Sequence, residues 1–215
     1  MKIKTVQKSY DDVLAIPPEK HQKPKRVNLF FRLLLKLVSL PDLLAVRFHC
    51  NRIGMEKLGK REPCLILMNH SSFVDLEIAA SVLFPRVFNI VATTDGFVGK
   101  RWLMRQIGCI PTKKFVSEMG LIRDVSYAIK TQKSSVLMYP EASYSFDGRA
   151  TVLPESLGKF VKLLGVPVVM ITTYGAFSRD PLYNNLQVRK VKVTAKMEYL
   201  LSVAETSGLR CKIGG

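Results

Sequence analysis

The chain contains 215 residues, 47% of them hydrophobic, and its mean hydropathy of +0.12 is high for a freely soluble protein. This length suits one domain with a sizeable core. Lys and Arg number 33 against 17 Asp and Glu, which gives a net charge of +16. A charge of that size indicates an anionic partner, and composition leaves nucleic acid, an anionic membrane surface and anionic substrates all open.

The inventory of reactive residues excludes some kinds of site. The only histidines are His21, His49 and His70, and the four cysteines form no C-x-x-C pair, so no zinc-binding pattern is present. Cys64 and Cys109 lie in or beside apolar runs, which is typical of reduced, buried thiols in a cytosolic setting. The absence of a Gly-rich phosphate loop argues against a nucleotide-hydrolysing enzyme.

The first 26 residues form a basic polar arm. Residues 1–12 contain no apolar core and do not read as a signal peptide. Prolines at positions 17 and 18 are followed by basic residues at 20, 23, 25 and 26. We expect a loosely packed arm, and a functional basic arm and a plain solvated tail are both consistent with this composition.

Residues 27–48 are predicted to form an amphipathic helical segment. Arg32 and Lys36 interrupt a dense apolar stretch at helical i, i+4 spacing, and Pro41 is expected to break it. No apolar run reaches the roughly 18 residues of a membrane-spanning helix. Two basic residues on one side with apolar groups elsewhere fit a helix lying at a membrane interface. A helix packed against the domain core is the alternative.

From residue 63 onward, strand and helix patterns alternate, and we assign residues 49–202 to one domain. Such alternation with short apolar strands predicts an α/β fold with a largely parallel sheet flanked by helices. Strands are predicted at 64–68, 89–93, 135–139 and 167–172. Helices are predicted at 72–83, 99–106, 118–130 and 155–164, with Ser117 capping the third and Gly165 ending the fourth.

The C-terminal part is predicted to contain one more strand. Apolar and polar residues alternate within residues 186–200. The residues predicted to face inward are Val191, Val193, Ala195 and Met197, and those predicted to face outward are Lys190, Lys192, Thr194 and Lys196. Exposed lysines are typical of an edge strand. Residues 203–215 are predicted to be an irregular tail.

A histidine and a carboxylate follow the first of these strands. His70 comes just after the strand and Asp75 lies in the first turn of the following helix, so their side chains can meet. A carboxylate that holds one imidazole nitrogen as a donor leaves the other as a general base. Amides at the same helix start could bind a developing oxyanion. The alternative is that Asp75 only caps the helix, because Ser72-x-x-Asp75 fits a capping-box-like pattern.

A second carboxylate falls at the same end of the predicted sheet. Glu141 follows the strand at 135–139, as His70 follows the strand at 64–68. In parallel sheets, ligands gather beyond the carboxyl ends of the strands. Glu141 is therefore a candidate for orienting a substrate, with a turn residue that caps backbone amides as the alternative.

Four motifs in order resemble those of the glycerolipid acyltransferase family, which includes the lysophosphatidic acid acyltransferases. They are Asn-His-Ser-Ser-Phe-Val-Asp at 69–75, Gly-Cys-Ile-Pro-Thr-Lys-Lys at 108–114, Tyr-Pro-Glu-Ala-Ser-Tyr-Ser at 139–145 and Val-Pro-Val-Val at 166–169. The similarity runs from about residue 63 to about residue 175. In this family the histidine, here His70, deprotonates an acceptor hydroxyl that attacks an acyl thioester.

The resemblance implies further site residues and also shows departures. Asn69, Glu141 and Ser143 match motif positions and are candidates for substrate binding. The second motif usually ends in Arg where this chain has Lys114. The third usually reads Gly-Thr-Arg where this chain has Ala-Ser-Tyr at 142–144. In the family, those arginines are linked to the acceptor phosphate.

Three basic residues are candidates for the phosphate. Lys113 and Lys114 can attract a phosphate as point charges, without the planar fork of arginine. A solvated lysine pair is the alternative. Arg149 is a candidate to replace the positive charge absent at Tyr144.

The function implied is transfer of an acyl group from acyl-CoA or acyl-carrier protein to the hydroxyl of a lysophospholipid, with lysophosphatidic acid giving phosphatidic acid. The acceptor would attack directly, with no cofactor and no metal. The expected location is peripheral, on the cytoplasmic face of a membrane. Alternatives are a lipid acceptor without phosphate and an inactive membrane-binding relative. A nucleic-acid-binding module is disfavoured, because the basic residues form no aromatic-interleaved patch.

Overall fold

The computed structural model describes most of the chain. The described residues are 21–72, 74–94, 101–112, 119–141, 143–145, 148–149, 152–179 and 191–209. Lys113, Lys114, Ser117 and the tail beyond residue 209 lie outside them.

A seven-stranded sheet in the order β1-β7-β6-β2-β5-β3-β4 forms the centre of the fold. The strands are β1 (His49–Ile53), β2 (Leu65–Met68), β3 (Phe88–Thr93), β4 (Cys109–Thr112), β5 (Ser135–Met138), β6 (Val168–Tyr174) and β7 (Thr194–Leu201). Every neighbouring pair is parallel except β6 and β7. The predicted α/β fold with a largely parallel sheet is confirmed.

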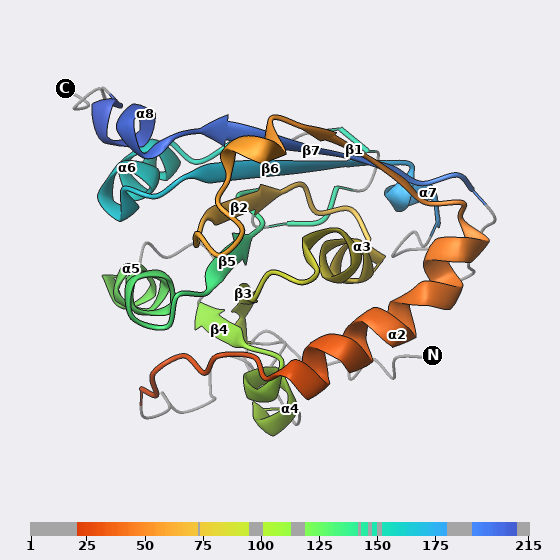
Figure 1. Ribbon diagram of the computed structural model, residues 1–215, viewed down its shortest axis with the longest axis horizontal. Coiled ribbons are helices and arrows are strands. Elements are labelled where there is room, and N and C mark those ends of the chain that lie inside the picture. Colours follow the sequence, from red (N-terminus) through yellow and green to blue (C-terminus); the bar gives the residue numbers. More distant parts are fainter. Residues whose placement is uncertain are drawn as a thin grey trace, which may run out of the picture.

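Helices cover both faces of this sheet (Figure 1). On one face lies α3 (Val74–Leu83), with α2 (Leu29–Ala45) packed outside it; on the other lie α5 (Met119–Ser126), the π-helical turn η3 (Tyr127–Thr131) and α6 (Ser156–Leu164). The short elements are η1 (Met55–Lys57), α4 (Arg101–Gln106), α7 (Ala176–Arg179) and α8 (Val203–Gly208).

The all-apolar sequence of β2 follows from burial on both faces. Ile66 and Met68 pack into the core on the α3 side, whereas Leu65 and Leu67 pack into the core beneath α5 and α6. All four side chains are buried. Alternate residues of a strand point to opposite faces, so a central parallel strand needs apolar residues at every position. The fold therefore places the end of β2, and His70 after it, in the middle of the sheet.

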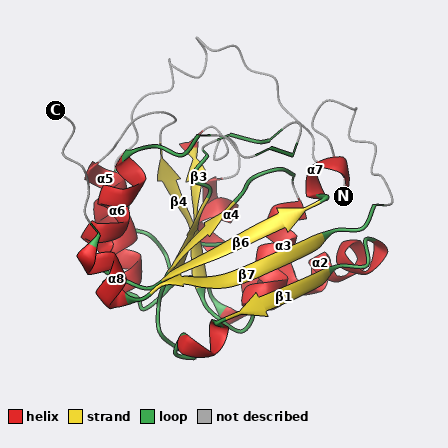
Figure 2. Cartoon of the chain, turned by 90° about the horizontal axis from the view of Figure 1, so that it is seen from above, coloured by secondary structure: helices red, strands yellow, loops and turns green. Residues whose placement is uncertain are grey.

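The predicted edge strand is not at the edge. Ala195 and Met197 are buried as the alternation predicted, but β1 pairs with β7 on its outer side. Figure 2 shows β6, β7 and β1 side by side. The sequence of β1 is His-Cys-Asn-Arg-Ile and its side chains are mostly exposed, so no apolar pattern marked it as a strand.

Other short elements were also missed. The second motif contains the edge strand β4, and α7 follows β6. The predicted irregular tail begins with α8, where Ser202 and Glu205 form a capping box. The Ser-x-x-Glu spacing was a usable signal for this helix start.

Two expectations about the N-terminal part are wrong within the described residues. Helix α2 continues through Pro41, which is exposed, as is Leu37 one turn earlier. Proline removes one backbone hydrogen bond there but does not end the helix. Residues 21–26, expected to be loosely packed, lie against the domain. Asn89 donates to the carbonyl oxygen of Lys25 and Gln132 to that of Pro24. Such backbone contacts leave no pattern in sequence.

Candidate active site

The turn between β2 and α3 brings His70 and Asp75 together. His70 Nδ1 lies 3.0 Å from Asp75 Oδ2; the histidine side chain is 18% exposed and the aspartate is fully buried. A carboxylate can only accept here, so Nδ1 carries the proton and Nε2 is left as the basic nitrogen. The predicted pairing of a general base with an orienting carboxylate has the required geometry.

Asp75 also caps the helix start. Its Oδ2 accepts hydrogen bonds from the backbone N–H groups of Ser71, at 2.7 Å, and Ser72, at 2.9 Å. Asp75 therefore makes the helix-capping contacts and also contacts His70, and its role in catalysis stays a prediction. The amides of Ser71 and Ser72 are engaged by Asp75, so they are not the oxyanion donors that the sequence suggested. Asp75 Oδ1 is buried and has no hydrogen-bond partner among the described residues.

Asn69 fixes the turn to the neighbouring strand. Its amide oxygen accepts from Thr173 N at 2.8 Å, and its amide nitrogen donates to Thr173 O at 3.1 Å. The Asn69 side chain thus continues the pairing of β2 with β6 beyond the end of β2. This fixes the backbone next to His70. A direct contact of Asn69 with substrate, which the resemblance implies, stays a prediction.

Two tyrosine rings lie against the imidazole of His70. The Tyr139 ring stacks on it with centroids 3.8 Å apart and planes 18° apart. The Tyr144 ring lies at the same centroid distance with planes 30° apart. Burial, and then the nearby charge of Asp75, raises the pKa of Tyr139 well above its usual value. Sequence analysis missed both contacts, although both tyrosines stand in the third motif.

The loop that carries Tyr144 is attached to the His70 turn. Ser145 N donates to the carbonyl oxygen of His70 at 2.6 Å, and Ser145 Oγ donates to that of Arg149 at 2.7 Å. Gly148 has a φ of +77°, and an added Cβ would lie 2.5 Å from the Phe177 ring of α7. A glycine is needed there for both reasons. The third motif is thus folded back onto His70.

The remaining predicted residues lie near this loop or outside the described chain. Glu141 follows β5 and is half-buried, whereas Ser143 and Arg149 are exposed. Ser143 Oγ donates to the Glu141 carbonyl oxygen at 3.3 Å. Because β2 and β5 are parallel neighbours, Glu141 and His70 lie at the same edge of the sheet. The substrate contacts of these residues stay predictions.

The two thiols that were predicted to be buried are buried in the structure. Cys64 and Cys109 are almost inaccessible, and burial raises the pKa of Cys109 to about 12. A thiol with so high a pKa is almost never a thiolate near neutral pH, so Cys109 is a structural residue.

Comparison with known proteins places these features in a wider context. The sequence model of the family described as Acyltransferase matches residues 49–173. A chloroplastic 1-acyl-sn-glycerol-3-phosphate acyltransferase, BAT2, from Brassica napus is 29% identical over 127 residues, which cover 57% of this chain and 36% of the relative. Its counterpart LPAT1 from Arabidopsis thaliana is 28% identical over 133 residues, with coverage of 60% and 36%. The matches span just over a third of these relatives' own length.

A solved structure shares the fold. The 1-acyl-sn-glycerophosphate (LPA) acyltransferase PlsC from Thermotoga maritima superposes with a TM-score of 0.63 at 16% identity, covering 85% of this chain and 72% of the other. At that identity the likeness concerns the arrangement of strands and helices. The family match includes both β2 and the turn that carries His70 and Asp75.

Proposed function

The chain belongs to the acyltransferase family, and we propose that it moves a fatty acyl group from a thioester, acyl-CoA or acyl-carrier protein, to the hydroxyl of a lysophospholipid. The observation that carries this proposal is the His70–Asp75 pair, whose geometry leaves Nε2 as a base. Lysophosphatidic acid is the acceptor we favour, because the similar plant proteins are described as 1-acyl-sn-glycerol-3-phosphate acyltransferases. Phosphatidic acid would then be the product.

In the proposed reaction, Nε2 takes the proton of the acceptor hydroxyl as its oxygen attacks the thioester carbonyl carbon. A C–O bond forms, the C–S bond breaks, and the thiolate leaves with the proton that the imidazolium returns. Nδ1 keeps its proton throughout and donates it in a hydrogen bond to Asp75, which stabilises the imidazolium. The acceptor attacks directly, so no covalent acyl-enzyme forms and no prosthetic group is needed.

The test is identification of the lipid product. Purified protein is incubated with detergent-dispersed lysophosphatidic acid and long-chain acyl-CoA or acyl-carrier protein, and the lipids are analysed by mass spectrometry. We expect phosphatidic acid with one added acyl chain. Acylation of monoacylglycerol in its place would keep the reaction and change the acceptor to one without phosphate. No acylated product from any pair would contradict the proposal and favour an inactive membrane-binding relative.

We propose that the protein lies peripherally on a membrane, because α2 presents an apolar surface outward. The cytoplasmic face stays the expectation from the sequence, where the cysteines indicate a cytosolic setting. No helix within the described ranges is both long and apolar enough to cross a bilayer. The exposed apolar residues of α2 are Leu29, Phe30, Leu33, Leu34, Leu37, Val38, Leu40 and Leu44. A contiguous apolar surface of this kind on a basic protein suits contact with an anionic lipid surface.

The basic residues of α2 lie toward the domain. Lys36 Nζ is 3.9 Å from the centroid of the Phe84 ring, and Arg32 approaches the same ring and donates to the Pro85 carbonyl oxygen. Desolvation by burial, and then the charge of Arg26, lowers the pKa of Arg32. With these two charges turned inward, the outward side of α2 is left to its apolar residues.

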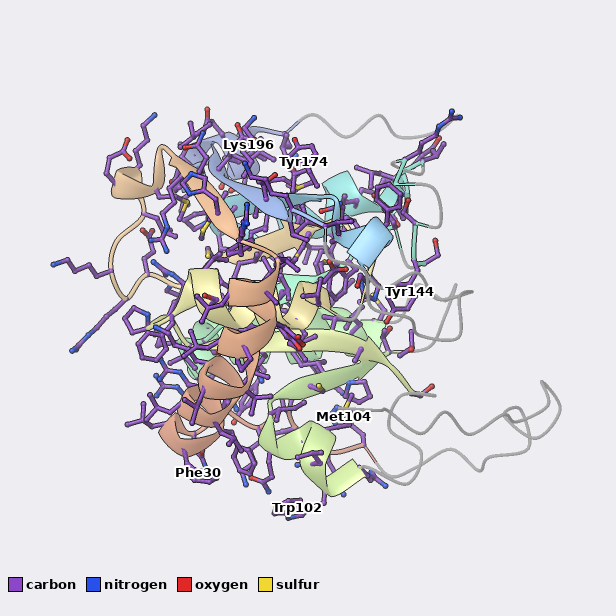
Figure 3. The ribbon with its side chains drawn as sticks, turned by 90° about the vertical axis from the view of Figure 1, so that its right-hand side faces the viewer. Phe30, Trp102, Met104, Tyr144, Tyr174 and Lys196 are labelled. Carbon is purple, nitrogen blue, oxygen red and sulfur yellow. The ribbon has the colours of Figure 1, made fainter. Side chains whose placement is uncertain are left out.

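Helix α4 adds an aromatic side chain to the same surface. Trp102 is 68% exposed and meets Phe31 edge to face, with centroids 6.2 Å apart, and Phe31 in turn meets Phe30. Figure 3 shows Phe30 and Trp102 at the same lower edge of the molecule. Amphipathic Trp rings favour the membrane–water interface, which supports the proposed contact.

We predict that the double substitution Phe30→Ser and Leu37→Ser weakens binding to vesicles containing anionic phospholipid by about 10- to 100-fold. Each apolar side chain contributes about 1.5–3 kcal/mol when fully buried, and partial immersion gives a fraction of that. Flotation of the protein with vesicles measures the change. The matched control is Val152→Ser with Leu163→Ser, which removes two exposed apolar residues elsewhere. Equal losses in both variants, or none in the first, would count against α2 as the contact.

A further inference from the structure

We propose that Tyr144, together with Tyr139, acts as a positioning residue that clamps the His70 imidazole and stabilises it when it becomes positively charged. The inference rests on the proposed function, because the imidazolium arises only if His70 serves as the base. It concerns Tyr144, which stands where the third motif of the family usually has an arginine.

The geometry is that of a sandwich. The centroids of both tyrosine rings lie 3.8 Å from the imidazole centroid. The ring planes are tilted from the imidazole plane by 18° for Tyr139 and 30° for Tyr144. Two nearly parallel rings at the same distance cannot occupy one side of the imidazole without overlapping. Tyr139 and Tyr144 therefore cover opposite sides, and neither ring lies over the edge of the imidazole that carries Nε2.

The two tyrosines reach His70 from one segment. Tyr139 directly follows β5, the parallel neighbour of β2, so its place beside His70 is set by the sheet. Tyr144 is held by the next residue, whose backbone N–H donates to the His70 carbonyl oxygen. The loop and the histidine are thus joined through both a backbone hydrogen bond and a ring contact.

This arrangement has a consequence for catalysis. The face of an aromatic ring carries partial negative charge and attracts a cation lying over it. When the acceptor O–H bond breaks and the proton moves to Nε2, the new positive charge lies between two such faces. The carboxylate oxygen that contacts the imidazole, Asp75 Oδ2, is shared with two backbone N–H groups. An oxygen that already accepts two other hydrogen bonds stabilises the imidazolium less strongly. The two tyrosine rings add to that stabilisation.

The clamp also restricts rotation. An imidazole that turns about its Cβ–Cγ bond must sweep through the space on either side of its plane, and both tyrosine rings fill that space. Nδ1 is therefore kept on Asp75 and Nε2 toward the substrate edge. Tyr139 is half-buried and packs against the core on the α3 side, whereas Tyr144 comes from a loop and can be replaced with less harm to the core.

The experiment compares Tyr144→Leu with Tyr144→Phe. We expect Tyr144→Leu to lower kcat about 10-fold, because one cation–π contact is lost, with little change in the KM for the thioester. Tyr144→Phe keeps the ring and should recover most of that loss. Tyr127→Leu on η3 removes a half-buried tyrosine on the α5 side of the sheet and is the matched control for folding and basal activity. A Tyr144→Leu enzyme with unchanged kcat, or a Tyr144→Phe enzyme as slow as it, would overturn the proposal.

A second readout does not require turnover. Protons of an imidazole stacked between rings resonate upfield, and His70 can be assigned by comparison with His70→Ala among the three histidines of the chain. Tyr144→Leu should move the His70 ring protons downfield, and Tyr144→Phe should not. If wild type transfers no acyl group, the proposed function fails and the catalytic role of the clamp falls with it. Unmoved resonances in an active Tyr144→Leu enzyme would overturn the clamp alone.

Discussion

Replacing His70 by alanine is expected to lower acceptor-dependent acyl transfer about 10²- to 10⁴-fold, the range that general-base catalysis contributes. Asp75 accepts the hydrogen bond from Nδ1, which leaves Nε2 of the imidazole as the basic nitrogen. Rates of thiol release from acyl-CoA at saturating acceptor measure the loss. The residual rate would come from binding the two substrates side by side.

The substitution must be separated from unfolding. The His70 side chain is partly exposed and lies between two tyrosine rings, so the domain core does not depend on it. We therefore expect cooperative thermal unfolding to persist in His70→Ala. A folded His70→Ala protein that keeps more than about a tenth of the wild-type rate would rule out His70 as the base.

Asp75→Asn is expected to lower turnover by about 10²- to 10⁴-fold with a smaller effect on folding. Asparagine removes the charge that stabilises the imidazolium, and its amide can turn an NH₂ group toward Nδ1 and so favour the wrong tautomer. Stability should fall by about 1–3 kcal/mol, because the backbone N–H groups of Ser71 and Ser72 lose a charged acceptor. Turnover and the free energy of unfolding are measured on the same preparation.

A matched control distinguishes the two roles of Asp75. Ser72 Oγ accepts from Val74 N at 3.3 Å at the same helix start. Ser72→Ala should cost about 1 kcal/mol of stability, as for other lost caps, with turnover close to wild type. If Asp75→Asn behaves like Ser72→Ala, with stability reduced and turnover retained, Asp75 is a helix cap and does not orient the base.

The contact between His70 and Asp75 could be predicted because it is local. His70 and Asp75 belong to one strand–turn–helix unit, and five residues of spacing fix how close the side chains come. The central strands were also predictable, since β2 and β5 are buried on both faces and read as short apolar runs. The αL conformation of Gly165 at the end of α6 follows from the same kind of local rule.

Features that depend on distant contacts could not be predicted. Asn69 is fixed by Thr173, which is 104 residues away in sequence. The alternation in β7 indicated which residues face the core but not that β1 would pair with its outer side. Tyr144 lies on a loop whose path depends on the Ser145 hydrogen bond and on the packing of Gly148 against Phe177. None of these partners has a spacing pattern that points to it.

The most direct test of the proposed activity is thiol release from a long-chain acyl-CoA, or from acyl-carrier protein, with and without lysophosphatidic acid. Direct attack by the acceptor predicts release that depends on the acceptor and equals the amount of phosphatidic acid formed. Release that proceeds equally without any lipid acceptor, or no release from either thioester with any lysolipid, would contradict the account.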